Sequence, residues 1–115
     1  MNLANESITT LRQRLVAKEI TPTDIVTDLA KAIETRNPAL GSYLSIDVES
    51  ALKEASTADV SRPLGGIPIA IKDNINVTGQ PCTCGSKFLQ GTYTAPYDAT
   101  SIVQLRIAGA VPMGR

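Results

Sequence analysis

The sequence predicts an α/β protein in which helices and short strands alternate. Apolar residues recur at helical spacing in several segments. The runs Ile67 to Ile71 and Ala110 to Met113 are instead apolar on both faces, as strands in the middle of a sheet are. The content of 43% apolar and 19% charged residues is ordinary for a globular protein and suggests neither disorder nor membrane insertion. At 115 residues the chain has the length of one domain.

Two helices are expected before the first strand. Ser7 is a candidate N-cap for the first helix, and Thr21-Pro22 is a typical start for the second. Asn37-Pro38 is expected to end the second helix, because the residue before a proline disfavours the α conformation. The apolar residues that share one face are Ile8, Leu11 and Leu15 in the first helix and Ile25, Leu29 and Ile33 in the second.

A short strand and a third helix follow. Tyr43 to Ile46 is predicted as the strand, and Asp47 can cap a helix that carries Val48, Ala51, Leu52 and Ala55 on one face. Asp59 to Pro63 then forms a short linker to the strand Ile67 to Ile71. The predicted order is therefore helix, helix, strand, helix, strand.

The last part of the sequence combines a loop, a helix and a strand. Asp73 to Gly85 is rich in Asn, Gly, Pro and Thr and is expected to be a long surface loop. Asp98 is a candidate cap for a helix that Gly109 ends, with Ile102, Val103, Leu105 and Ile107 along it. The strand from Ala110 would lack the sheet that buries it, so we expect a truncated or partial sequence.

Lys72 ends the apolar run Ile67 to Ile71 and is the main catalytic candidate. A lysine at a strand end most often packs its stem and keeps its ammonium in water. Desolvation there would lower its pKa and favour the neutral amine, which can accept a proton. Lys72 is therefore either a solvated surface lysine or a base.

The string Leu64-Gly-Gly-Ile-Pro-Ile-Ala-Ile-Lys-Asp-Asn-Ile75 resembles the amidase signature family, as do Gly79-Gln-Pro-Cys-Thr-Cys-Gly-Ser-Lys87 and Tyr97-Asp-Ala-Thr100. The likeness is closest to the branch formed by the A subunits of glutamyl-tRNA(Gln) amidotransferases. This likeness implies that the chain is the N-terminal part of a single amidase domain. The domain would have a mixed central sheet covered by helices. Residues 1–62 would be a mainly helical N-terminal region, and residues 63–115 the start of the catalytic core.

The resemblance also implies a reaction and its partners. In the family, the lysine corresponding to Lys72 works with a serine in a cis peptide and a nucleophilic serine, both in a later segment. Lys72 is then the only catalytic residue of this sequence, which is expected to be inactive alone. The full protein would hydrolyse glutamine and pass ammonia to a B subunit, which uses ATP and Mg²⁺ to activate Glu-tRNA(Gln), while a C subunit braces the pair.

The net charge of the chain and its N-terminal residues indicate which partners and which cellular location to expect. Lys+Arg 11 balance Asp+Glu 11, so a free-standing nucleic-acid binder is not expected, and any tRNA contact should come mainly from a partner. No basic segment followed by an apolar stretch opens the sequence, and no run approaches membrane-spanning length. A cytoplasmic location without membrane contact is expected.

Cys82 and Cys84 are predicted to be reduced thiols that bind no metal. One residue separates them, which is too tight for a common disulfide, and the sequence contains no histidine for a mixed zinc site. The chain itself is expected to hold no cofactor.

Several other motifs have simpler structural explanations. Ser86 is expected to be a cap or loop residue, because the family's nucleophile belongs to a different segment. Ser50 and Lys53 have the spacing of a serine-lysine pair but lack its companion motifs. The glycines of Gly109-Ala-Val-Pro-Met-Gly114 are spaced as in a phosphate loop, yet they close a helix and enter a strand. The remaining alternatives are a stand-alone amidase and a small non-catalytic binding module.

Overall fold

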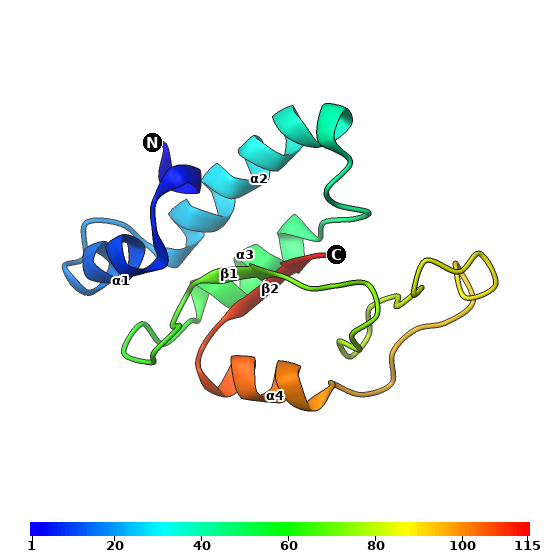
Figure 1. Ribbon diagram of the computed structural model, residues 1–115. Coiled ribbons are helices and arrows are strands. Elements are labelled where there is room, and N and C mark those ends of the chain that lie inside the picture. The colour runs from blue at the N-terminus through cyan, green and yellow to red at the C-terminus, as the bar shows by residue number, and fades with distance from the viewer.

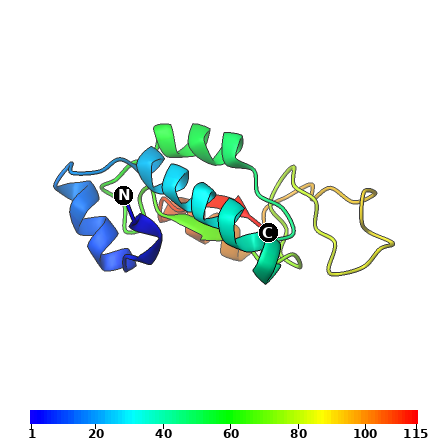
Figure 2. The same ribbon diagram turned by 90° about the horizontal axis from the view of Figure 1, so that it is seen from above.

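The computed structural model describes the whole chain, residues 1–115. Its elements are, in chain order, η1 (Leu3–Asn5), α1 (Ile8–Val16), α2 (Pro22–Leu40), α3 (Val48–Ser56), β1 (Pro68–Ala70), α4 (Thr100–Ile107) and β2 (Val111–Gly114). Figure 1 shows α2 above the two strands and α4 below them. In Figure 2, α2 and α3 run side by side over the same face of the strands. The predicted α/β class, with helices covering a sheet, is confirmed.

The two strands are parallel and adjacent. Pro68 lies opposite Val111, and the pair is closed by the Val111 N–H bond to the Ile67 carbonyl (2.9 Å) and the Ile71 N–H bond to the Gly114 carbonyl (2.8 Å). Because parallel strands need a long connection, the loop and α4 fill the interval between them. The carboxyl ends of both strands therefore lie at the same edge.

The predicted strand Tyr43 to Ile46 is not a regular strand; only Ile46 forms an antiparallel bridge, to Gly114. The Arg115 N–H bonds to the Ser45 carbonyl (2.9 Å), and the Asp47 N–H to the Met113 carbonyl (3.1 Å), so the segment does follow the second edge of β2. The approach is close: a Cβ added at Gly114 would lie 2.8 Å from Ile46 Cγ2. β2 thus has a parallel neighbour on one side and an antiparallel segment on the other, which gives the mixed pairing that was expected.

The helix N-caps follow local chemistry. Ser7 accepts a hydrogen bond from the Thr10 N–H, and Asp47 accepts one from the Ser50 N–H, as predicted. Thr21 and Asp24 form a reciprocal capping box at the start of α2. These caps define the starts of α1, α2 and α3.

The prediction that Asn37-Pro38 ends α2 is wrong. The helix continues through Pro38 to Leu40 and ends at Gly41, whose φ of 61° is the left-handed conformation that glycine adopts at little cost. The Asn37 side chain bonds both the N–H (2.8 Å) and the carbonyl (3.0 Å) of Tyr43 and so holds the returning chain against the last turn. This local contact offsets the one backbone bond that a proline removes.

Asp98 does not cap α4, contrary to prediction. The N-cap is Ala99, with no side-chain bond. The Asp98 carboxylate instead accepts the Thr78 N–H (2.7 Å) and Nε of Arg106 (2.9 Å), and Arg106 also reaches Glu54 (2.9 Å). A charged donor makes a stronger bond than a helix N–H does, so the carboxylate turns toward Arg106.

Three small apolar clusters form the core. The first joins η1, α1, α2 and the start of β1, the second joins α2, α3 and β2, and the third joins the end of β1 to α4. Their buried members are Leu3, Leu11, Leu15, Ile20, Ile25 and Ile67; Val26, Ala51, Ala55, Val111 and Met113; and Ile71, Val77 and Ile102. Of the apolar residues expected along α4, only Ile102 is buried, while Val103 and Ile107 are exposed.

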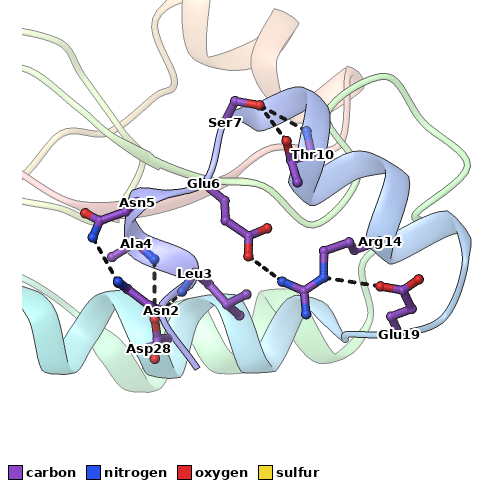
Figure 3. Close-up of polar contacts among 10 residues, drawn as sticks. All are labelled: Asn2, Leu3, Ala4, Asn5, Glu6, Ser7, Thr10, Arg14, Glu19 and Asp28. Carbon is purple, nitrogen blue, oxygen red and sulfur yellow. Dashed lines mark hydrogen bonds and ion pairs between the residues drawn. The ribbon is translucent and has the colours of Figure 1, made fainter.

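The first residues are attached to α2 by a carboxylate. Figure 3 shows Asp28 accepting hydrogen bonds from the N–H groups of Leu3 (2.7 Å) and Ala4 (3.3 Å). Arg14 of α1 forms ion pairs with Glu6 and Glu19 in the same view. These contacts fix η1 and α1 on the side of the molecule away from the 73–85 loop. None of the helices has both the length and the apolar character needed to cross a membrane.

Candidate functional site

Lys72 lies where the carboxyl ends of β1 and β2 meet. It follows Ile71, whose N–H bonds to the Gly114 carbonyl at 2.8 Å. The Lys72 side chain is exposed, and its ammonium takes part in none of the ion pairs of the chain. Residues 1–115 therefore do not shield the Lys72 side chain from water, although the sequence had suggested that a buried position was one possibility.

Lys72 lines an open groove of about 710 Å³. Its walls come from the segment after α2, the end of β1 and the 73–85 loop. The lining residues are Gly41, Ser42, Tyr43, Leu44, Ala70, Ile71, Lys72, Asp73, Asn74, Cys84, Gly85 and Arg115. A groove of this volume is within the range of small-molecule sites, and it lies at the edge where open α/β sheets commonly bind ligands.

Asp73, the residue after Lys72, holds the loop to the end of β2. One carboxylate oxygen accepts the Thr83 N–H (3.3 Å) and Nε of Arg115 (3.2 Å), and the other accepts the Thr83 hydroxyl. The Asp73 backbone carbonyl accepts the Cys84 N–H (2.8 Å) and the Cys82 thiol (3.5 Å). One residue thus organises the whole turn beside Lys72.

The pKa of the Asp73 carboxyl lies below its ordinary value. Burial alone would raise this pKa, but the hydrogen bonds from Thr83 and then the Arg115 guanidinium stabilise the charged form more strongly. Asp73 is therefore an anion in the folded chain at neutral pH.

Arg115 is the buried cation of the site. Its guanidinium reaches Asp73 through Nε, the Gln80 side chain through Nη1 (3.4 Å) and the Ile75 carbonyl through Nη2 (2.6 Å). Its side chain is only 3% exposed. The planar fork of arginine suits this divergent set of acceptors, which lysine could not reach together.

Both cysteines are free thiols, and they lie in different environments. Cys82 is buried, and burial, followed by the neighbouring Cys84, raises the pKa of its thiol. Cys84 is exposed at the rim of the groove. Since the thiolate is the reactive form, Cys82 is a packing residue.

None of the remaining candidates lines the groove around Lys72. Ser86 accepts a hydrogen bond from the Phe88 N–H (3.2 Å) within the loop, which confirms its backbone-bonding role. Ser50 and Lys53 lie on α3. Gly109 follows α4 and leads into β2, the context that argued against a phosphate loop.

The sequence identified Lys72 as the main candidate but missed the Asp73, Thr83 and Arg115 contacts. Arg115 and Asp73 are 42 positions apart, and no spacing rule connects them. The only available signal was the arginine at the end of a buried strand, which requires a buried anion as its partner.

Comparison with known proteins places these features in a family. A family model described as amidase matches residues 24–115. The A subunit of the glutamyl-tRNA(Gln) amidotransferase of Methylacidiphilum infernorum is 47% identical over 115 residues, which cover all of this chain and 23% of that protein. The protein of the same name from Akkermansia muciniphila is 53% identical over 104 residues, covering 90% of this chain and 22% of that protein. The chain therefore spans less than a quarter of the length of these relatives.

A solved structure of an amidase has the same fold over the residues that it shares with this chain. The native peptide amidase from Stenotrophomonas maltophilia superposes with a TM-score of 0.87 at 33% sequence identity. The superposition covers 97% of this chain and 24% of the peptide amidase.

Proposed function

The chain belongs to the amidase family, and we propose that it is part of the A subunit of a glutamyl-tRNA(Gln) amidotransferase. The proposed reaction is the hydrolysis of glutamine to glutamate and ammonia. The ammonia would convert Glu-tRNA(Gln) to Gln-tRNA(Gln) during translation.

The observation that carries this proposal is the position of Lys72. It follows β1, lies beside the end of β2 and faces an open groove. Ligands of open α/β sheets commonly bind outside the carboxyl ends of the strands. The names of relatives at 47% and 53% identity support the choice of the amidotransferase branch within the family.

In the proposed mechanism, the neutral amine of Lys72 accepts the proton of one serine, which in turn accepts the proton of a second, nucleophilic serine. The nucleophile's oxygen bonds to the amide carbon of glutamine. The C–N bond then breaks, the nitrogen leaves with a proton as ammonia, and a glutamyl ester remains, which water hydrolyses. We assign both serines to a part of the protein outside residues 1–115. That part would also cover the groove and keep the Lys72 amine drier than it is here.

The proposal includes partners. A B subunit would bind Glu-tRNA(Gln) and use ATP with Mg²⁺, and a C subunit would brace the assembly. No cofactor is assigned to this chain, and the site of action would be the cytoplasm, where translation takes place. The balanced charge of the chain, with Lys+Arg 11 and Asp+Glu 11, is consistent with tRNA being held mainly by a partner.

The isolated 115-residue chain is expected to release no ammonia from glutamine. A lysine without a nucleophile cannot form an acyl-enzyme, because groups that act as a unit contribute little once one is removed. Ammonia release by the purified chain would be measured against its Lys72→Ala variant. Release well above this control would locate the nucleophile within residues 1–115 and overturn the assignment of the serines.

A stand-alone amidase is the second candidate, and the likeness to a peptide amidase at 33% identity favours it. The two are separated by assaying the full-length protein on glutamine and on small peptide amides, with and without B and C subunits. Glutamine hydrolysis that depends on the other subunits supports the amidotransferase. Efficient hydrolysis of peptide amides by the protein alone would contradict it. Sequencing the gene beyond the codon for Arg115 tests the shared part of both proposals, since each requires a later serine-rich segment.

A further inference from the structure

We propose that Asp73 is a positioning residue for Lys72, held in place by Thr83 and Arg115. Asp73, Thr83 and Arg115 are together called the Asp73 clamp below. The inference rests on the proposed function, because it concerns how the amine of Lys72 is presented to the reacting serine. Asp73 itself would not touch the substrate.

The backbone is held on both sides of Lys72, by strand pairing before it and by the clamp after it. Before Lys72, the Ile71 N–H bonds to the Gly114 carbonyl at 2.8 Å. After it, Asp73 is held by its carboxylate and by its carbonyl, which accepts the Cys84 N–H at 2.8 Å. The Lys72 carbonyl accepts the Ile75 N–H at 3.0 Å. The direction of the Lys72 side chain therefore depends on where Asp73 is held.

No regular secondary structure could replace this anchor. Between β1 and α4 the chain contains no helix or strand, only turns and the single bridge between Pro81 and Thr94. Thr83 joins Asp73 to the middle of this stretch, and Arg115 joins it to the end of β2. Without the carboxylate, Asp73 in the turn after Lys72 would lose its side-chain links to Thr83 and to Arg115 at once and keep only the bonds that its backbone carbonyl accepts.

Within the clamp, Asp73 and Arg115 form the least exposed ion pair of the chain. The side chains of Arg115 and Asp73 are 3% and 14% exposed, whereas those of Arg62 and Asp59 are 49% and 56% exposed. A shielded pair is weakly screened by salt, and removing one partner leaves a buried charge uncompensated. This is the property expected of a group that must hold a fixed geometry.

Asp98 provides a matched control. Its carboxylate also accepts a backbone N–H, from Thr78, and an arginine Nε, from Arg106. Asp98 does not line the groove that contains Lys72. Asp73→Ala and Asp98→Ala therefore remove the same kind of carboxylate from the same kind of contact, and only the first is next to the proposed base.

The test compares these variants in the full-length protein. For Asp73→Ala we expect kcat for glutamine hydrolysis to fall about 100-fold with KM nearly unchanged, because a displacement of about 1 Å can cost that factor. Thr83→Val should also lower kcat, and Thr83→Ser should restore it because the hydroxyl is kept. Asp98→Ala should leave kcat and KM within about twofold of wild type, because Asp98 does not line the groove that contains Lys72.

Hydrogen exchange of backbone amides supplies a readout that does not depend on activity. Asp73→Ala should expose the Thr83 amide, and Asp98→Ala the Thr78 amide, since each change removes the oxygen that accepts that N–H. If Asp73→Ala exposes the Thr83 amide but keeps wild-type kcat, Asp73 only holds the loop and the positioning role is wrong. A wild-type protein with no amide hydrolysis would instead overturn the proposed function on which the inference rests.

Discussion

Lys72→Ala and Lys72→Arg are each expected to abolish amide hydrolysis by the full-length protein while leaving its fold intact. Lys72 is exposed and forms no ion pair, so neither change removes a packing contact of this chain. Arginine keeps the positive charge but cannot be deprotonated at working pH, so it cannot act as a base. Loss of a general base typically costs about 10²–10⁴ in rate.

Ammonia release and far-UV circular dichroism, measured on the same preparations, would test this prediction. Lys53→Arg, on an exposed lysine of α3, is the matched control and should behave as wild type. If Lys72→Arg kept most of the wild-type turnover, Lys72 would act only through its charge, and the proton-transfer role would have to be dropped.

The isolated chain is expected to be aggregated or loosely packed, without a cooperative unfolding transition. Only 22 of its 115 residues are buried, and the largest buried apolar cluster contains only 6 residues, in a flat body of 46 × 32 × 20 Å. Phe88 and Ile107 are 85% and 59% exposed, and β1 has no strand on its outer edge. Exposed apolar surface and free strand edges favour association over a compact monomer.

Near-UV circular dichroism of its three tyrosines, calorimetry and gel filtration would follow this behaviour. A broad, weakly cooperative transition or a concentration-dependent size is the expected result. A sharp two-state transition from a soluble monomer would oppose the view that a larger domain covers these surfaces. It would favour a small binding module instead.

Local chemistry made much of the fold predictable. The caps at Ser7, Thr21 and Asp47 were correct because each depends on residues within one helical turn. The strands near Ile67 to Ile71 and Ala110 to Met113 were correct because both are apolar on both faces. Membership of the amidase family was visible in the string around Lys72 and was confirmed by the family match to residues 24–115.

The incorrect predictions involve partners more than one helical turn away in the sequence. Pro38 stays within α2 because Asn37 binds Tyr43 after the turn. Asp98 leaves the α4 cap for Arg106 and for the loop. The clamp of Asp73 was hidden for the same reason, since Arg115 comes from the far end of the chain. Periodicity and capping rules describe neighbours in sequence, so contacts of this kind need the three-dimensional structure.

The most direct test of the proposed function is formation of Gln-tRNA(Gln) by the full-length protein assembled with B and C subunits. Two nitrogen sources, glutamine and ammonium chloride, are compared in wild type and Lys72→Ala. We expect wild type to use both, and Lys72→Ala to lose glutamine-dependent formation while keeping ammonium-dependent formation. The reason is that Lys72 would serve only the release of ammonia and not its transfer. Glutamine-dependent formation by Lys72→Ala at the wild-type rate would contradict the proposed role of Lys72.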